Sequence, residues 1–234
     1  MRNVWVFIGI FIFTVTGYLV MTRNIMERKS EIRYVALGDS YTIGEGATES
    51  ESWPNVLTGH LRDAGLDIKL VANPSVTGYT TKDLIDLELS IFESSEPTFA
   101  TLLIGVNDWV QGVSEEDFRE NLIVILDRMQ AKLPDKSKIV LVTIPDFGVT
   151  PVGANFSNGR DIAEGIDRYN MIIKSEGVRR NIGVVDIYPL TQQMKGDLVS
   201  TDGLHPSAKE YALWEKLIFP VAREILKDFL PQNK

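Results

Sequence analysis

The chain has 234 residues, which suits a single α/β domain, and it contains no cysteine, so disulfides, thiolate catalysis and cysteine-ligated metals are excluded. The formal net charge of the whole chain is −8, from 24 basic and 32 acidic residues. The first 30 positions hold four of the basic residues and one of the acidic residues. The remainder therefore has 20 basic and 31 acidic residues and a net charge of −11. Such a surface repels polyphosphates, and no stripe of Lys and Arg with interleaved aromatic residues is visible, so we expect no nucleic-acid partner.

The N-terminal part of the sequence contains 18 consecutive uncharged residues at positions 4–21. A membrane-spanning helix needs about 17–25 apolar residues, whereas a cleaved signal peptide has a shorter apolar region of about 7–15 and a small-residue cleavage site, which we do not find after Tyr18. Residues 1–30 are therefore interpreted as an uncleaved membrane anchor. A cleaved signal, which would give a secreted protein, and a buried core helix are the alternatives. The basic residues that follow the segment outnumber the single one before it, which taken alone favours a cytoplasmic catalytic domain.

From residue 31 to 234 the sequence alternates between short apolar runs and amphipathic stretches. The apolar runs predict five strands, at residues 32–37, 67–72, 99–104, 139–144 and 182–187. Helices are predicted from capping residues and helical spacing at residues 54–64, 80–89, 114–133, 162–176 and 206–229. This pattern predicts an α/β fold: a three-layer α/β/α sandwich with a five-stranded parallel sheet. The Pro- and Gly-rich stretch at residues 145–159 is expected to be a loop that shapes a site.

Four short motifs fall near the expected carboxyl ends of strands or close to the end of the chain. They are Gly38-Asp39-Ser40, Asn73-x-Ser75-x-x-Gly78, Gly105-x-Asn107-Asp108 and Asp202-x-x-His205. In open parallel sheets, ligands bind at the carboxyl ends of strands. A serine hydroxyl needs a neighbouring imidazole as base, an acid that orients the imidazole, and donors for an oxyanion. The motifs contain candidates for all three.

In this order, the motifs resemble the SGNH hydrolases, also called GDSL esterases/lipases. The resemblance runs from residue 32 to the C-terminus and includes two further segments seen in bacterial members, GDSYTIGE at residues 38–45 and IPDFGVTP at residues 144–151. It implies a flavodoxin-like SGNH hydrolase fold, a monomeric catalytic domain outside the cytoplasm, and neither cofactor nor metal.

The resemblance also implies a role for each matched residue. Ser40 would be the nucleophile, His205 the general base and acid, and Asp202 the group that orients the imidazole. The backbone N–H groups of Ser40 and Gly78 and the side-chain amide of Asn107 would form the oxyanion hole.

Several other residues are interpreted as structural. Asp39 and Asp108 are expected to hold their loops by accepting N–H bonds, and His60 to lie at the surface of a helix. The aromatic residues near the motifs could line a pocket, but side chains of this kind more often belong to a core: Trp53, Trp109, Phe147 and Phe156.

The expected function is hydrolysis of a carboxylic ester through an acyl-Ser40 intermediate. Two alternatives use the same fold: transfer of the acyl group to a sugar or lipid hydroxyl, and a membrane-tethered binding module without activity. The Gly-x-Ser-x-Gly elbow of α/β-hydrolases and the P-loop are absent, and Gly44-Glu45-Gly46 lacks the third glycine of a dinucleotide fingerprint. Acetylated wall sugars, short-chain esters, lysophospholipids and thioesters all remain possible substrates.

Overall fold

The computed structural model describes residues 31–230 of the chain. The anchor expected at residues 1–30 lies outside these residues. Within the described part, no helix combines the length and the apolar character needed to cross a membrane.

Five parallel strands form one sheet, in the order β2-β1-β3-β4-β5. The strands are β1 (Ile32–Gly38), β2 (Ile68–Ala72), β3 (Phe99–Leu103), β4 (Ile139–Val142) and β5 (Gly183–Val185). The predicted five-stranded parallel sheet is therefore confirmed, with somewhat shorter third, fourth and fifth strands. The chain places β2 on one side of β1 and then crosses to place β3 on the other side. The carboxyl ends of β1 and β3 thus flank the topological switch point, where ligands bind in folds of this kind.

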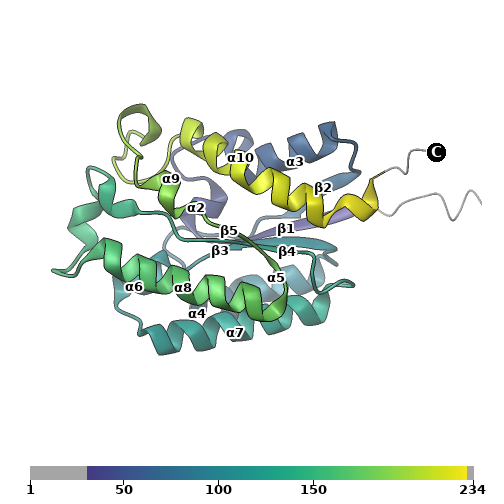
Figure 1. Cartoon of the computed structure of the whole chain (residues 1–234), viewed down its shortest axis with the longest axis horizontal. Coiled ribbons are helices and arrows are strands. Elements are labelled where there is room, and N and C mark those ends of the chain that lie inside the picture. Colours follow the sequence, from purple (N-terminus) through teal and green to yellow (C-terminus); the bar gives the residue numbers. More distant parts are fainter. Residues whose placement is uncertain (1–30, 231–234) are drawn as a thin grey trace, which may run out of the picture. The chain divides into compact units, whose positions relative to one another are not determined.

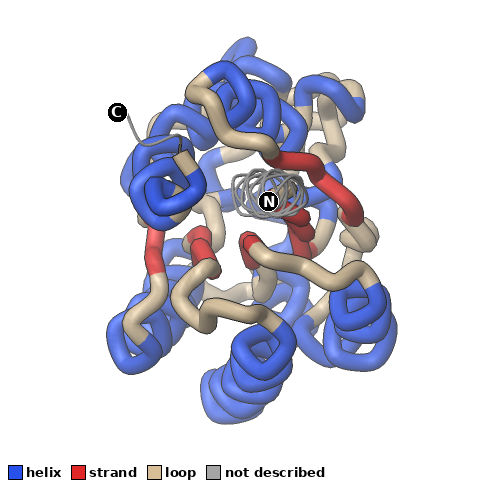
Figure 2. The backbone as a smooth tube through the Cα atoms, turned by 90° about the vertical axis from the view of Figure 1, so that its right-hand side faces the viewer, coloured by secondary structure: helices blue, strands red, loops and turns tan. Residues whose placement is uncertain are grey.

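Helices cover both faces of the sheet (Figures 1 and 2). On one face, α10 packs against α3, β4 and β5, and α3 packs against β2; on the other face, α7 packs against both α5 and α8. The longer helices are α3 (Trp53–Asp63), α7 (Glu115–Lys132), α8 (Ile162–Arg180) and α10 (Ala208–Ile225), and α5 (Leu89–Ser94) is a shorter one. The three layers expected from the sequence are confirmed.

Two helices begin where the capping residues predict. The Thr80 hydroxyl accepts the backbone N–H of Asp83 at 3.3 Å, and the Ser114 hydroxyl accepts that of Asp117 at 3.0 Å. Each bond satisfies a donor that has no partner inside the first helical turn.

The structure also contains elements that the sequence patterns do not predict. Three are short helices of four to six residues, which are too short to show an amphipathic period: α2 (Ser40–Ile43), α6 (Val106–Gln111) and α9 (Tyr188–Thr191). The helix expected at residues 80–89 begins with α4 (Thr81–Asp83) and continues through a π-helical turn η2 (Leu84–Glu88) into α5. Residues 145–159 contain the 3₁₀ turns η3 (Phe147–Val149) and η4 (Gly153–Phe156). The last helix ends at Ile225 and is followed by the turn η6 (Lys227–Phe229), so the predicted end at residue 229 is wrong for the α-helix itself.

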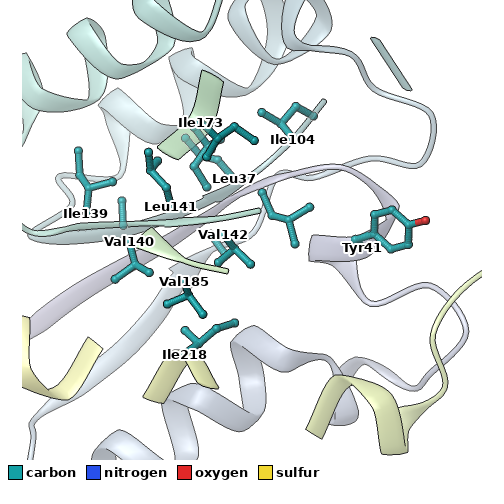
Figure 3. Close-up of a cluster of buried hydrophobic side chains, with 14 of the residues drawn as sticks. Leu37, Tyr41, Ile104, Ile139, Val140, Leu141, Val142, Ile173, Val185 and Ile218 are labelled. Carbon is teal, nitrogen blue, oxygen red and sulfur yellow. The ribbon is translucent and has the colours of Figure 1, made fainter. Parts of the chain in front are cut away.

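The central strands are buried on both faces, which explains their uninterrupted apolar runs. Every residue of β3 and β4 is buried. Figure 3 shows the alternation along β4: Ile139 and Leu141 point toward the side of Ile173 on α8, whereas Val140 and Val142 point toward the side of Ile218 on α10. Each such side chain stabilises the fold by about 1.5–3 kcal/mol relative to an exposed position. This packing fixes the strand ends that carry the site.

Candidate active site

The carboxyl ends of β1 and β3 bring two of the motifs together. Gly38 is the last residue of β1 and pairs with Leu103, the last residue of β3. Ser40 follows Gly38 by two residues, and Asn107 follows Leu103 by four. A Cβ at position 38 would overlap the Leu103 carbonyl oxygen and the Thr42 side chain, so only glycine permits this close approach. The sheet register therefore sets the spacing between these motifs.

Asp39 fixes the turn that carries Ser40. It is the N-cap of α2, and its Oδ1 accepts the backbone N–H of Tyr41 at 3.0 Å, as expected for a residue that holds the loop. The side chain is fully buried, and burial raises its pKa to about 8, although the bond from Tyr41 acts in the opposite direction. Ser40 is the first residue of α2 and is 5% exposed.

Three of the predicted site residues form one continuous hydrogen-bonded chain. Ser40 Oγ lies 3.0 Å from His205 Nε2, and His205 Nδ1 lies 2.7 Å from Asp202 Oδ2. Partial burial opposes ionisation of Asp202, but hydrogen bonds from the Ser200 hydroxyl and from the backbone N–H groups of Leu204 and His205 hold its pKa well below the usual range. An ionised carboxylate only accepts hydrogen bonds, so neutral His205 carries its proton on Nδ1, and Nε2 is free to accept the Ser40 proton.

A tight loop before α10 holds Asp202 and His205 side by side. Val199 and Pro206 form an isolated antiparallel bridge, and the Ser200 N–H donates to the His205 carbonyl at 2.8 Å. Gly203 has a φ of 75°, a left-handed conformation that closes the turn with little steric cost. Because Asp202 and His205 lie within this turn, their distance to each other is set locally, whereas their distance to Ser40 depends on the packing of α10.

Of the two remaining predicted site residues, Gly78 lies on the loop after β2 and Asn107 lies in the first turn of α6. Gly78 is exposed, with a φ of 86° and no heavy atom within 4 Å of where a Cβ would stand. The Asn107 amide donates to the carbonyl of Tyr79 at 2.9 Å, which ties it to the residue next to Gly78. An amide has two N–H groups, so one remains available for a ligand.

Asp108 further connects α6 to the segment that follows Gly78. Its carboxylate accepts the Thr81 backbone N–H at 2.9 Å and also the Thr81 hydroxyl. Asp108 is buried, and burial raises its pKa, with the bonds from Thr81 acting in the opposite direction. It thus holds the loop, as the sequence suggested, at the start of α4.

A small, mainly apolar pocket opens beside Ser40 and His205. Its volume is about 70 Å³, and it is lined by Ser40, Tyr41, Val106, Asn107, Val110, Phe147, Phe156, Leu204 and His205. Two of the four aromatic candidates, Phe147 and Phe156, therefore line this pocket. Trp53 is buried and donates to the Tyr41 carbonyl at 3.0 Å, and Trp109 packs against Gly165, so both belong to the core.

Glu45 is a residue at this site that the sequence argument did not select. Its Oε2 lies 3.8 Å from His205 Nε2 and accepts a hydrogen bond from the Thr77 hydroxyl. The backbone is also anchored, because the buried Tyr211 hydroxyl donates to the Glu45 carbonyl at 2.8 Å. The only sequence signal was its position at the end of the segment GDSYTIGE.

Glu45, Asp202 and His205 also form the one group within residues 31–230 whose ligand atoms could hold a metal ion, since these atoms lie within 4.8 Å of one another. His205 Nδ1 and the Asp202 carboxylate are already bonded to each other. The Asp202 carboxylate also accepts three further hydrogen bonds from its own loop. The arrangement matches a hydrogen-bonded relay better than an open set of ligands.

Comparison with known proteins agrees with this geometry. The model of the GDSL-like lipase/acylhydrolase family matches residues 36–213. A multidomain esterase of Ruminococcus flavefaciens is 36% identical over 118 residues, which cover 49% of this chain and 14% of the relative. A GDSL-like esterase of Mycobacterium tuberculosis is 25% identical over 208 residues, covering 86% of this chain and 64% of the relative. The chain thus spans less than two thirds of the length of either relative.

Solved structures show the same fold. A lipase/acylhydrolase from Enterococcus faecalis superimposes with a TM-score of 0.67 at 24% identity, covering 87% of this chain and 100% of the other. The acetylxylan esterase Axe2 from Geobacillus stearothermophilus superimposes with a TM-score of 0.66 at 18% identity, covering 87% and 98%.

Proposed function

The chain belongs to the GDSL-like lipase/acylhydrolase family, and we propose that it is a serine esterase that hydrolyses carboxylic esters through an acyl-enzyme on Ser40. One observation carries this proposal: Ser40, His205 and Asp202 form an uninterrupted chain of hydrogen bonds of 3.0 and 2.7 Å at the edge of a small apolar pocket. That chain supplies a nucleophile, a base and an orienting acid in contact with one another.

In the first half of the reaction, Ser40 Oγ attacks the ester carbonyl carbon while its proton passes to His205 Nε2. The imidazolium that forms is stabilised by the Asp202 carboxylate on Nδ1. Collapse of the tetrahedral intermediate breaks the bond to the alcohol oxygen, which takes the proton from Nε2 and leaves. In the second half, a water molecule gives a proton to Nε2 and attacks the acyl group, and the proton returns to Ser40 as the acid leaves.

The negative charge on the tetrahedral intermediate requires donors in fixed positions. We assign this role to the backbone N–H groups of Ser40 and Gly78 and to the side-chain amide of Asn107. The open surroundings of Gly78 let a substrate oxygen approach its backbone, and the bond from Asn107 to the Tyr79 carbonyl orients the amide. A preorganised amide donates without being ionised and needs no reorientation during the reaction.

The size of the small pocket favours a substrate with a short acyl group. A volume of about 70 Å³ accommodates only a few water-sized groups, and Val110, Phe147 and Phe156 form much of its apolar wall. We therefore propose acetate to butyrate esters as the preferred acyl class.

We also propose that residues 4–21 anchor the enzyme in a membrane with the catalytic domain outside the cytoplasm. The anchor is supported by the run of 18 uncharged residues, which is long enough to span a bilayer. The orientation rests on the family resemblance and runs against the basic residues after the segment, which favour the cytoplasmic side. Membrane fractionation of cells that express the full chain, followed by protease treatment of intact cells, tests both points. Recovery in the soluble cell fraction would contradict the anchor, and protection of the catalytic domain from protease would contradict the orientation.

The test of the esterase is hydrolysis of p-nitrophenyl acetate, butyrate and octanoate by the purified full-length chain, with Ser40→Ala as the matched variant. We expect activity on the two shorter esters and its loss in Ser40→Ala, which removes the nucleophile and leaves the fold intact. Folded protein without activity on any of these esters would contradict the esterase and favour an acyltransferase that needs its own acceptor, or a binding module.

A further inference from the structure

Two hollows lie near the Ser40–His205 pair, and the small apolar pocket is lined by both residues. The second is a groove of about 670 Å³ between the segment after α2, the start of α3 and the end of β2. Its wall includes Glu45, Glu49, Asn55, Asn73 and Thr77. It is therefore much larger and more polar than the small apolar pocket.

Glu45 connects this groove to the reacting atoms. Its carboxylate lines the groove and lies 3.8 Å from His205 Nε2. In the proposed mechanism, Nε2 gives its proton to the leaving alcohol, so that oxygen must lie next to Nε2. The bond from the Thr77 hydroxyl to Glu45 places both side chains at the same end of the groove, one residue from Gly78. An alcohol group leaving from the site therefore extends past Glu45.

The polar atoms that the groove leaves free are mainly acceptors. Both N–H groups of the Asn55 amide have acceptors, at the Glu49 carbonyl and the Ser52 hydroxyl. The Asn73 amide donates one of its two N–H groups to the Thr42 carbonyl, and Thr77 donates to Glu45, so one Asn73 N–H is the donor that the side chains leave free. Among residues 31–230, by contrast, the Glu49 carboxylate has no hydrogen-bond or ion-pair partner, and it is exposed. A ligand in the groove thus meets acceptors that require donors such as hydroxyl groups.

The charge of the groove also indicates which ligands it can bind. Glu45 and Glu49 line it, and no Lys or Arg does. The apolar part of its surface includes Ile43, Leu70 and Val71. A carboxylate or phosphate on the alcohol would be repelled by both glutamates and would find no cation to bind.

We propose that this groove is the subsite for the alcohol part of the substrate, that it selects an uncharged alcohol bearing additional hydroxyl groups, and that Glu45 and Glu49 reject anionic alcohols. The inference rests on the proposed esterase function. The groove selects the chemical class of the alcohol that leaves, whereas the small pocket limits the size of the acyl group.

The test compares three acetate esters that differ only in the alcohol. The probes are a monoacetylated methyl glucoside, the matching monoacetylated methyl glucuronide, in which a carboxylate replaces the C6 hydroxymethyl group, and cyclohexyl acetate, which has no free hydroxyl. Acetate release gives kcat/KM for each probe. At low salt, we expect kcat/KM for the glucoside ester to be about ten times that for cyclohexyl acetate. It should also be about five times or more that for the glucuronide ester. The discrimination against the glucuronide should decrease at high ionic strength, because salt screens exposed charges.

Substitutions of the two glutamates test whether the groove causes the preference for the uncharged alcohol. Glu45→Gln and Glu49→Gln keep the size of each side chain and remove its charge, so each should reduce the preference for glucoside over glucuronide, mainly through KM. Glu116→Gln, an exposed glutamate on α7, is the control and should keep the wild-type preference.

Two results would overturn the inference while leaving the esterase in place: equal hydrolysis of the three acetates by a Ser40-dependent activity, or an unchanged charge preference in both groove variants. Failure to hydrolyse any acetate, p-nitrophenyl acetate included, would instead overturn the proposed function together with this inference.

Discussion

The carboxyl group of Glu88 accepts a hydrogen bond of 3.1 Å from the backbone N–H of Gly38, the residue two positions before Ser40. Glu88 ends the π-helical turn η2, and its side chain is almost completely buried. Burial raises its pKa to about 8; the bond from Gly38 lowers it, and the neighbouring carboxylate of Asp39 raises it further. The π-helical turn thus places a largely protonated acid beneath the turn that carries the nucleophile.

This buried acid makes stability depend on pH. Folded Glu88 keeps its proton up to about pH 8, whereas unfolded Glu88 loses it near the ordinary value of 4.5. The folded state therefore binds more protons in that window, and the free energy of unfolding decreases as pH rises through it, by up to about 1.4 kcal/mol per pH unit for one group. Glu88→Gln keeps an acceptor for Gly38 and cannot ionise. We expect a shallower decrease in urea unfolding experiments between about pH 5 and 8. Equal slopes in this variant, in wild type and in the Glu116→Gln control would show that Glu88 does not titrate in this way.

Asn107→Ala removes one proposed oxyanion donor. Loss of such a donor costs about 2.7–4 kcal/mol of transition-state stabilisation, so we expect kcat for p-nitrophenyl acetate to fall roughly 10²- to 10³-fold with a smaller change in KM. Asn121→Ala is the matched control, since its amide donates to the Thr81 hydroxyl and not to the site. A loss of less than about threefold in kcat would remove Asn107 from this role.

Asp202→Asn keeps the shape of the side chain and replaces an acceptor by an amide that can also donate. His205 could then place its proton on Nε2, the wrong nitrogen for accepting the Ser40 proton. We expect kcat to fall about 10³- to 10⁴-fold while thermal unfolding shows a folded protein. Asp197→Asn serves as the control, because Asp197 is an exposed partner of Lys209 outside the site. Near-normal turnover in Asp202→Asn would mean that Asp202 does not orient the base.

Phe156→Ala should enlarge the acyl pocket. Phe156 is 36% exposed and forms part of the apolar wall near Ser40, so its removal opens the pocket toward solvent. We expect the ratio of octanoate to acetate kcat/KM to rise about tenfold or more. Val178→Ala, at an exposed position of α8, should leave the ratio unchanged. An unchanged ratio in Phe156→Ala would place the acyl chain elsewhere.

The fold could be predicted well from the sequence because its main signals are local. Buried strands in a parallel sheet appear as continuous apolar runs, and the two capping predictions at Thr80 and Ser114 depend on residues three positions apart. The short helices and the π-helical turn were missed for the same reason, because a helix of a few residues shows no period and Glu88 is held in place by a residue 50 positions away.

For the site, the residue types and their order along the chain can be read directly from the sequence. Ser40, Gly78, Asn107, Asp202 and His205 follow from motifs that are each only a few residues long, and family membership follows from their order. Their catalytic roles stay predictions until the variants are measured.

Which side chains meet depends on the packing of the folded chain. Ser40 and His205 are 165 positions apart, and their 3.0 Å contact depends on how the loop before α10 packs against the end of β1. The approach of Glu45 to His205, the acidic groove and the small acyl pocket are likewise formed by residues from distant segments. Local patterns indicate the conformation of one segment. A contact between distant segments depends instead on the packing of the whole sheet and its helices. For this reason, the substrate-binding features could be identified only in the three-dimensional structure.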